Sequence, residues 1–177
     1  MKSEKTKLIL VLIFMLLLTA AFAGCAKNDA ENDSADLTLE DIVKKIYENV
    51  DVPPYETIRL DSSNFEYYAF IPYDDSLSAV AADALVNITP HSVVVIRTED
   101  GNGESLAEDI ILNADPNKWL CVRAEQVNVA YTDHYVLLVM SEKAIADDIT
   151  ANFNDLSKDL DDTEMTLLTA YSSFYEQ

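Results

Sequence analysis

Apolar and polar residues alternate with a helical period in two parts of the chain. Apolar residues at positions 39, 42, 43, 46, 47 and 50 share one face of a helix, and Pro53-Pro54 ends it. Thr38 is expected to cap this helix, with Asp41 reaching back as in a capping box. Residues 105–113 have the same spacing and predict a second helix, which stops at Asp115-Pro116.

Continuous apolar runs at 91–98 and 135–140 predict strands that are buried on both faces of a sheet. Residues 118–131 also have a strand pattern, but the parity of their apolar positions changes near 125–126, which favours a β-bulge there. The turn at 132–134 should join this strand to the run at 135–140 in a hairpin.

Three further elements follow from composition. The aromatic segment 64–73 predicts a strand closed by Pro72, and the alanine-rich segment 75–86 predicts a short helix. Ser141 is expected to cap a helix that begins at Glu142.

This order of elements favours an α/β (α+β) fold, with a single mixed β-sheet of about four strands covered by helices. Residues 37–156 should form this one globular domain, and residues 157–177 a C-terminal helical extension. Apolar residues recur every seven positions at 153, 160, 167 and 174, which is typical of a coiled coil. Thr163 and Ala170 interrupt the second line of such a seam, so a second helix that starts near residues 161–162 and folds back on the domain is favoured over an intermolecular coiled coil.

The N-terminal region contains a long run of mainly apolar residues without charge, residues 8–23, which follows Lys2, Lys5 and Lys7. It is shorter than the roughly 20 residues that cross a bilayer, and it ends in small residues, so residues 1–24 are predicted to be a signal peptide. Residues 22–25, Phe-Ala-Gly-Cys, resemble the lipobox of bacterial lipoproteins. The resemblance implies that Cys25 is lipidated and becomes the mature N-terminus. An uncleaved membrane anchor is the alternative.

Charge narrows the choice of partners. Residues 1–24 contain three lysines and one glutamate, so the remaining chain keeps nine basic and 31 acidic residues, a net charge of −22. Residues 25–36 are polar and acidic and should be a flexible tether after the lipidated cysteine. This charge argues against nucleic acid and against an anionic lipid surface. It would attract cations or basic partners, although a surface whose acids serve only for solvation is favoured.

The sequence contains no catalytic, cofactor or metal motif. The two histidines, His91 and His134, are expected to face solvent or to cap strand ends, because no further zinc ligands are spaced near them. Cys121 is expected to be a buried, inert thiol, and Trp119 a core anchor. Acids at 159, 161, 162 and 164 could attract Ca²⁺, but they lack the EF-hand spacing and glycine, so a solvated face is favoured. Aromatic residues 67, 68, 70 and 73 could bind wall sugars, although strand alternation would place half of them in the core.

Several stretches together, "SVVVIRTED", "DPNKWLCVRAEQVNV", "YVLLVMSEKA" and a final helix with Phe153, follow the lipobox and acidic tether. In this combination residues 37–156 resemble a family of small lipoproteins of Gram-positive, clostridia-type bacteria, whose shared domain has no assigned function. The resemblance implies a lipid-anchored domain on the extracytoplasmic face of the cell membrane.

We therefore expect a non-enzymatic interaction module that contacts an envelope protein through its C-terminal helix or its aromatic strand, without a cofactor. A ligand- or cation-binding lipoprotein for uptake or sensing is the alternative, followed by a wall-active hydrolase, which would need a cleft with acids of raised pKa.

Overall fold

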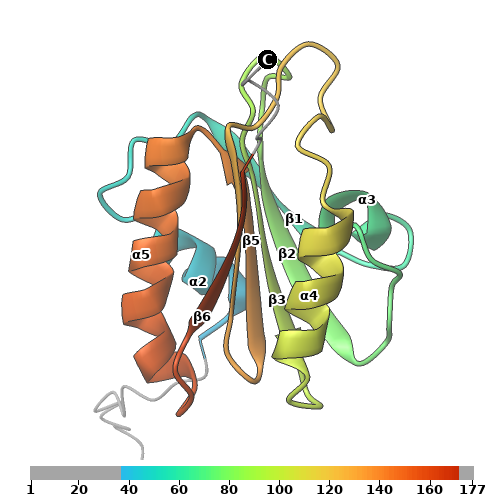
Figure 1. The fold of residues 1–177 in the computed structure, drawn as a ribbon, viewed down its shortest axis with the longest axis vertical. Helices are drawn as coiled ribbons and strands as arrows, with labels where there is room; N and C mark the ends of the chain where they lie inside the picture. Colours follow the sequence, from blue (N-terminus) through green and yellow to red (C-terminus); the bar gives the residue numbers. More distant parts are fainter. Residues whose placement is uncertain (1–36, 172–177) are drawn as a thin grey trace, which may run out of the picture. The chain divides into compact units, whose positions relative to one another are not determined.

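The computed structural model describes residues 37–171, which form a six-stranded antiparallel sheet with helices on both faces (Figure 1). The predicted signal peptide, Cys25 and the tether lie outside the described residues. The strand order across the sheet is β1-β2-β3-β5-β4-β6. In chain order the elements are α2 (Leu39–Ile46), β1 (Tyr55–Leu60), α3 (Phe65–Ala69), β2 (Leu77–Ala84), β3 (Ser92–Thr98), α4 (Gly103–Asn113), β4 (Gln126–Tyr131), β5 (Tyr135–Ser141), α5 (Lys143–Leu160) and β6 (Thr166–Tyr171).

The sheet separates two hydrophobic cores. One core lies under α2 and α5 and contains Ile42, Ile149 and Phe153; the other lies under α3 and α4 and contains Phe65 and Ile110. Strand β3 serves both cores, because alternate side chains of an extended strand point to opposite faces. The α+β class expected from the sequence is therefore confirmed. The sheet, however, has six strands where about four were expected, and its pairings are all antiparallel where a mixed sheet was expected.

The elements with the most regular apolar patterns were predicted well. Helix α2 has Thr38 as its N-cap, whose hydroxyl accepts a hydrogen bond from the Asp41 N–H and donates one to the Asp41 carboxylate. Strands β3 and β5 are buried on both faces, and residues 132–134 join β4 to β5 as the expected hairpin. Helix α4 begins at Gly103, two residues before its expected start, and buries Ile110.

Two neighbouring predictions were wrong. Residues 64–73 contain the short helix α3, where a strand was predicted, and residues 75–86 contain strand β2, where a helix was predicted. Alanine has the highest helix propensity, but β2 lies between β1 and β3 and its alanines pack against both cores. Tertiary burial therefore overrides local propensity here. Strand β1 was not predicted, because it is an edge strand with mostly exposed or half-buried side chains.

The predicted strand over 118–131 is also too long. Only residues 126–131 pair with β5 and β6, without a bulge, and the preceding residues form an irregular loop. Ser141 belongs to β5 and does not cap α5; the backbone N–H of Lys143 donates instead to the Glu125 carboxylate, at 3.0 Å.

The predicted C-terminal helical extension was wrong as well over residues 161–171, and its last residues, 172–177, lie outside the described residues. Helix α5 ends at Leu160, and Thr166–Tyr171 form strand β6 beside β4. Phe153, the first residue of the heptad-like series, is fully buried under the sheet, so it cannot take part in an intermolecular coiled coil. Among residues 37–171, no helix combines the length and the apolar character that crossing a bilayer requires.

Candidate functional site

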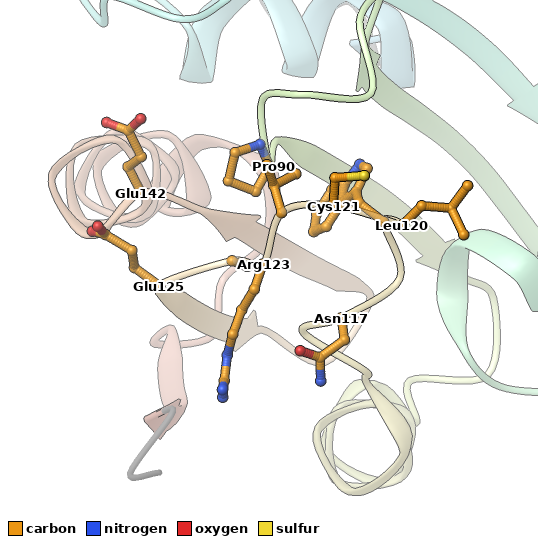
Figure 2. Close-up of a pocket in the computed structure, with 10 residues that line it drawn as sticks. Pro90, Asn117, Leu120, Cys121, Arg123, Glu125 and Glu142 are labelled. Carbon is orange, nitrogen blue, oxygen red and sulfur yellow. The ribbon is translucent and has the colours of Figure 1, made fainter. Parts of the chain in front are cut away.

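Two loops meet at one end of the sheet, beside the start of α5. They are residues 85–91, between β2 and β3, and residues 114–125, between α4 and β4 (Figure 1). A recess of about 840 Å³ opens there and is lined by Pro90, Asn117, residues 119–125 and Glu142 (Figure 2). We call these two loops and the recess the loop-end surface.

Lys118 fixes the 114–125 loop to the sheet. Its ammonium group is 3.1 Å from the carboxylate of Asp83, at the end of β2, and donates to the hydroxyl of Ser92 at 2.9 Å. The Lys118 side chain is only 3% exposed. Its burial lowers the pKa of this ammonium group, and the Asp83 carboxylate opposes that shift.

Aromatic rings enclose the same ammonium group. It lies 4.7 Å from the ring centre of Tyr68, 5.1 Å from that of Tyr67 and 5.4 Å from that of Trp119. Such distances allow cation–π attraction, which strengthens as the cation loses water. Trp119 is itself buried in the core under α3 and α4, as the sequence predicted. The loop is therefore held by two adjacent buried side chains.

The next two residues of the loop, Leu120 and Cys121, are exposed to solvent. Leu120 is 99% exposed, and Cys121 is exposed, which contradicts the expected buried thiol. The neighbouring loop adds Leu85, Val86 and Ile88, of which Ile88 is 75% exposed. Pro90, from that loop, and Leu120 line the same recess. Four large apolar side chains thus lie exposed at one end of the sheet, a pattern more common at binding sites than on an inert surface.

The other side of the recess is charged. Figure 2 shows Glu125 and Glu142 together on the side of α5, whereas Leu120 lies on the opposite side. The Glu125 carboxylate caps α5, and the Glu125 N–H donates to the carbonyl of Ser141 at 3.0 Å. The surface therefore combines an apolar part with a charged part, in which Glu125 is fixed to a helix N-terminus and Arg123 also lines the recess.

Of the two histidines, His91 was predicted incorrectly and His134 correctly. His91 is fully buried: its Nε2 is 2.7 Å from the hydroxyl of Tyr47, and its Nδ1 is 3.0 Å from that of Ser141. Burial lowers the pKa of His91 to about 4, with a small opposing effect of Asp83. Because no part of His91 reaches solvent, it can support the sheet but not meet a ligand. His134 is exposed and faces Asp161, at 3.2 Å.

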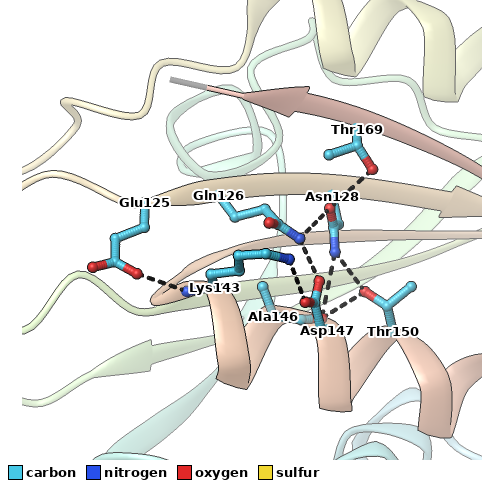
Figure 3. Close-up of polar contacts among 8 residues, drawn as sticks. All are labelled: Glu125, Gln126, Asn128, Lys143, Ala146, Asp147, Thr150 and Thr169. Carbon is cyan, nitrogen blue, oxygen red and sulfur yellow. Dashed lines mark hydrogen bonds and ion pairs between the residues drawn. The ribbon is translucent and has the colours of Figure 1, made fainter. Parts of the chain in front are cut away.

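A buried polar network joins α5 to strands β4 and β6 of the sheet (Figure 3). Asn128, on β4, donates to the Thr150 hydroxyl of α5 at 3.0 Å and accepts from the Thr169 hydroxyl of β6 at 3.2 Å. Gln126 donates to Asn128 at 3.0 Å and also to Asp147. These bonds tie the edge strand β6 to α5 through a single asparagine.

The remaining candidate residues are placed differently from what a calcium site or a flat sugar platform requires. Within residues 37–171, no group of three or more His, Cys, Asp or Glu side chains is placed to hold a metal ion. Asp161, one of the acids considered for Ca²⁺, accepts hydrogen bonds from the backbone and ring of His134. Tyr67 and Tyr68 lie on α3 with their rings perpendicular and contact Lys118, so they do not form a flat sugar platform.

Sequence reasoning did not find the residues that build the loop-end surface. Lys118 and Asp83 are 35 positions apart and carry no motif. The one available signal was the lysine beside Trp119 in a loop that follows Asp115-Pro116, and the strand prediction over 118–131 concealed it.

Comparisons with known proteins give no further guide: no family model matches the chain, and neither does a curated protein or a solved structure. The resemblance to small clostridia-type lipoproteins therefore stays a prediction.

Proposed function

We propose that this chain is a lipid-anchored extracytoplasmic protein that binds a protein of the cell envelope through its loop-end surface. The observation that carries the proposal is the 99% exposure of Leu120 directly after two buried residues, Lys118 and Trp119. The chain holds an apolar side chain in water at a fixed place, although neighbouring parts of the same loop are buried.

The energetics favour this reading. Burying one leucine side chain in a partner is worth about 2 kcal/mol, and ordering a mobile loop would offset part of that gain. Here the loop is already ordered by the contacts of Lys118 with Asp83 and the aromatic rings. Leu85, Val86 and Ile88 enlarge the apolar area available to the same partner.

The loop-end surface lies away from the point where the described chain begins. Leu37, the first described residue, lies near the end of β1, the start of β2 and the end of β3. This is the end of the sheet opposite to the loop-end surface (Figure 1). A tether from a lipidated Cys25 would therefore enter the domain at one end and leave the apolar loops at the other.

Charge complementarity describes the partner further. Glu125 and Glu142 flank the recess, and the full chain has a net charge of −20. A partner should therefore present apolar side chains to Leu120 and Ile88, with lysine or arginine facing the two glutamates.

Cys121 provides the experiment. If Cys25 is lipidated, Cys121 is the remaining free thiol of the two cysteines in the sequence, and it is exposed beside Leu120. A thiol-reactive photo-crosslinker on Cys121, used on intact cells, should capture one abundant envelope protein. The variant Leu120→Asp should reduce that capture at least tenfold.

A matched control moves the thiol to the other end of the sheet. Ser78 is exposed at the start of β2, so a Cys121→Ser/Ser78→Cys double variant carries the same reagent far from the recess. Capture of the same proteins from both positions, or capture that Leu120→Asp does not change, would refute the proposed surface.

Lipid anchoring is tested separately. The variant Cys25→Ala should lose incorporation of labelled palmitate and move from the membrane fraction to the soluble fraction. A variant that still sediments with membranes would support the uncleaved anchor instead.

A further inference from the structure

The two edges of the sheet differ in the protection of their backbone. An edge strand exposes unpaired N–H and C=O groups, and proteins usually guard such strands with charged residues, proline or a bulge. Strand β1 is guarded: Pro53-Pro54 precede it, and it contains Glu56 and Arg59. Arg59 is also paired with Glu40 of α2 at 2.7 Å.

Strand β6 has no such protection. Its sequence, Thr-Leu-Leu-Thr-Ala-Tyr, contains no charge, proline or glycine. It pairs with β4 on one side, and no described strand pairs with its other side. Leu167 is 44% exposed. This composition is typical of a strand that can pair with another strand on its outer side, and it lacks the residues that usually prevent such pairing.

The contacts of β6 also define one register. Six residue pairs join it to β4, from Gln126 with Tyr171 to Tyr131 with Thr166. The hydrogen bond from Thr169 to Asn128 links this register to the buried network under α5. A one-residue slip would turn Thr169 to the opposite face and break that bond. The outward backbone groups of β6, with which no described strand pairs, therefore lie in one defined row and can act as a template for an added strand.

Two partly buried side chains of β6 favour such an addition. Leu168 and Ala170 pack against the core under α4 but stay half-buried at its margin. A further strand would cover them and add main-chain hydrogen bonds, which is the usual basis of strand addition to a sheet edge.

Charge decides between a second copy and another protein. Asp162 and Glu164 lie just before β6, and each copy of the chain has a net charge of −20. Two copies would repel each other, whereas a basic segment would be attracted. All five strand pairings in this sheet are antiparallel, and an antiparallel addition places the C-terminal end of the new strand beside Asp162 and Glu164.

We propose that β6 is a strand-addition site for an extended segment of another protein, with alternating apolar and β-branched residues and lysine or arginine at its C-terminal end. This site is separate from the loop-end surface and does not depend on it.

The test uses the full-length chain in detergent and a pool of eight-residue peptides that alternate valine, isoleucine and threonine and end in two lysines. Peptides of the pool should slow amide hydrogen exchange in residues 166–171 at least tenfold, with little change in β1. The same peptides with alternate backbone nitrogens methylated should give no protection, because they lack the donors that a ladder needs.

Matched variants locate the site. Leu167→Lys introduces a charge on the edge strand and should weaken binding at least tenfold, whereas Thr57→Lys on β1 should not change it. Leu167→Lys should also leave cross-linking through Cys121 unchanged, so the two surfaces are tested independently.

Three results would overturn the proposal. They are no protection of residues 166–171 by any peptide, equal protection by the methylated peptides, and protection of these residues that rises with protein concentration alone. The last result would identify a second copy as the occupant.

Discussion

The ammonium nitrogen of Lys118 lies 3.1 Å from Oδ1 of Asp83, across 35 positions of sequence. The pair joins an irregular loop to the end of β2, with both side chains largely buried. This ion pair holds residues 114–125 against the sheet, so that the loop has a fixed position in the loop-end surface. Removing the ion pair is the most direct test of whether it holds the loop in place.

Lys118→Met should destabilise the fold by about 3 kcal/mol, because it leaves the carboxylate of Asp83 buried without its cation. Proteolysis should then cut near Leu120 faster than elsewhere in residues 37–171. Urea unfolding and limited proteolysis measure the two effects. Lys158→Met is the control, since the ion pair of Lys158 with Asp155 is exposed and should contribute less than about 1 kcal/mol. Equal effects of the two substitutions would contradict the anchoring role.

His91 should make stability depend on pH between about 4 and 6.5. Its pKa falls from 6.5 to about 4 in the folded chain, so within this range the unfolded chain binds a proton that the folded chain does not. Stability should therefore decrease as the pH falls, by about 3 kcal/mol over the whole range. Urea unfolding at a series of pH values measures the slope.

The variant His91→Gln checks the assignment. It keeps polar groups near Tyr47 and Ser141 but cannot titrate, so most of the slope between pH 4 and 6.5 should disappear. Carboxylates with lowered pKa values, such as those of Asp147 and Asp161, lose their contribution below about pH 4 and should not mask the effect. A slope that persists unchanged would show that another group is responsible.

Asn128→Ala should destabilise the chain by about 2 kcal/mol and loosen β6. The asparagine bonds to Thr150 and Thr169, and its loss leaves both hydroxyls and the Gln126 amide short of a partner. Hydrogen exchange should become faster in residues 166–171 than in β3. Thr169→Val removes one bond only and should cost about 1 kcal/mol, with changes restricted to β6.

Gly103→Ala should destabilise more strongly than Gly101→Ala. A Cβ at position 103 would lie 2.0 Å from the carbonyl oxygen of Thr132, so the hairpin of β4 and β5 would have to move. Position 101 has space, but its φ of +64° disfavours alanine by about 1 kcal/mol. Overpacking at position 103 should cost about 3 kcal/mol in denaturant unfolding. The reverse order would show that backbone conformation matters more than the close contact.

Some elements could be predicted because their own residues contain enough information. The apolar run of β3 and the helical spacing of α2 each identify an element and its buried face, since burial requires a matching period. The alanines of β2 and the aromatic residues of α3 gave the opposite assignments. Their local preferences are weak compared with the packing of β2 between two strands and two cores.

The sequence by itself predicted the α+β class and located strands β3 and β5 and helix α2 from their apolar patterns, whereas the signal peptide and the lipidated Cys25 stay predictions. Only the tertiary structure decided that Lys118 pairs with Asp83, that the side chain of Leu120 is exposed to solvent, and that an uncharged strand, β6, lies at one edge of the sheet. The physical reason is distance along the chain. Periodicity reports the surroundings of a residue within one element, whereas ion pairs, exposed loops and sheet edges depend on which distant elements become neighbours.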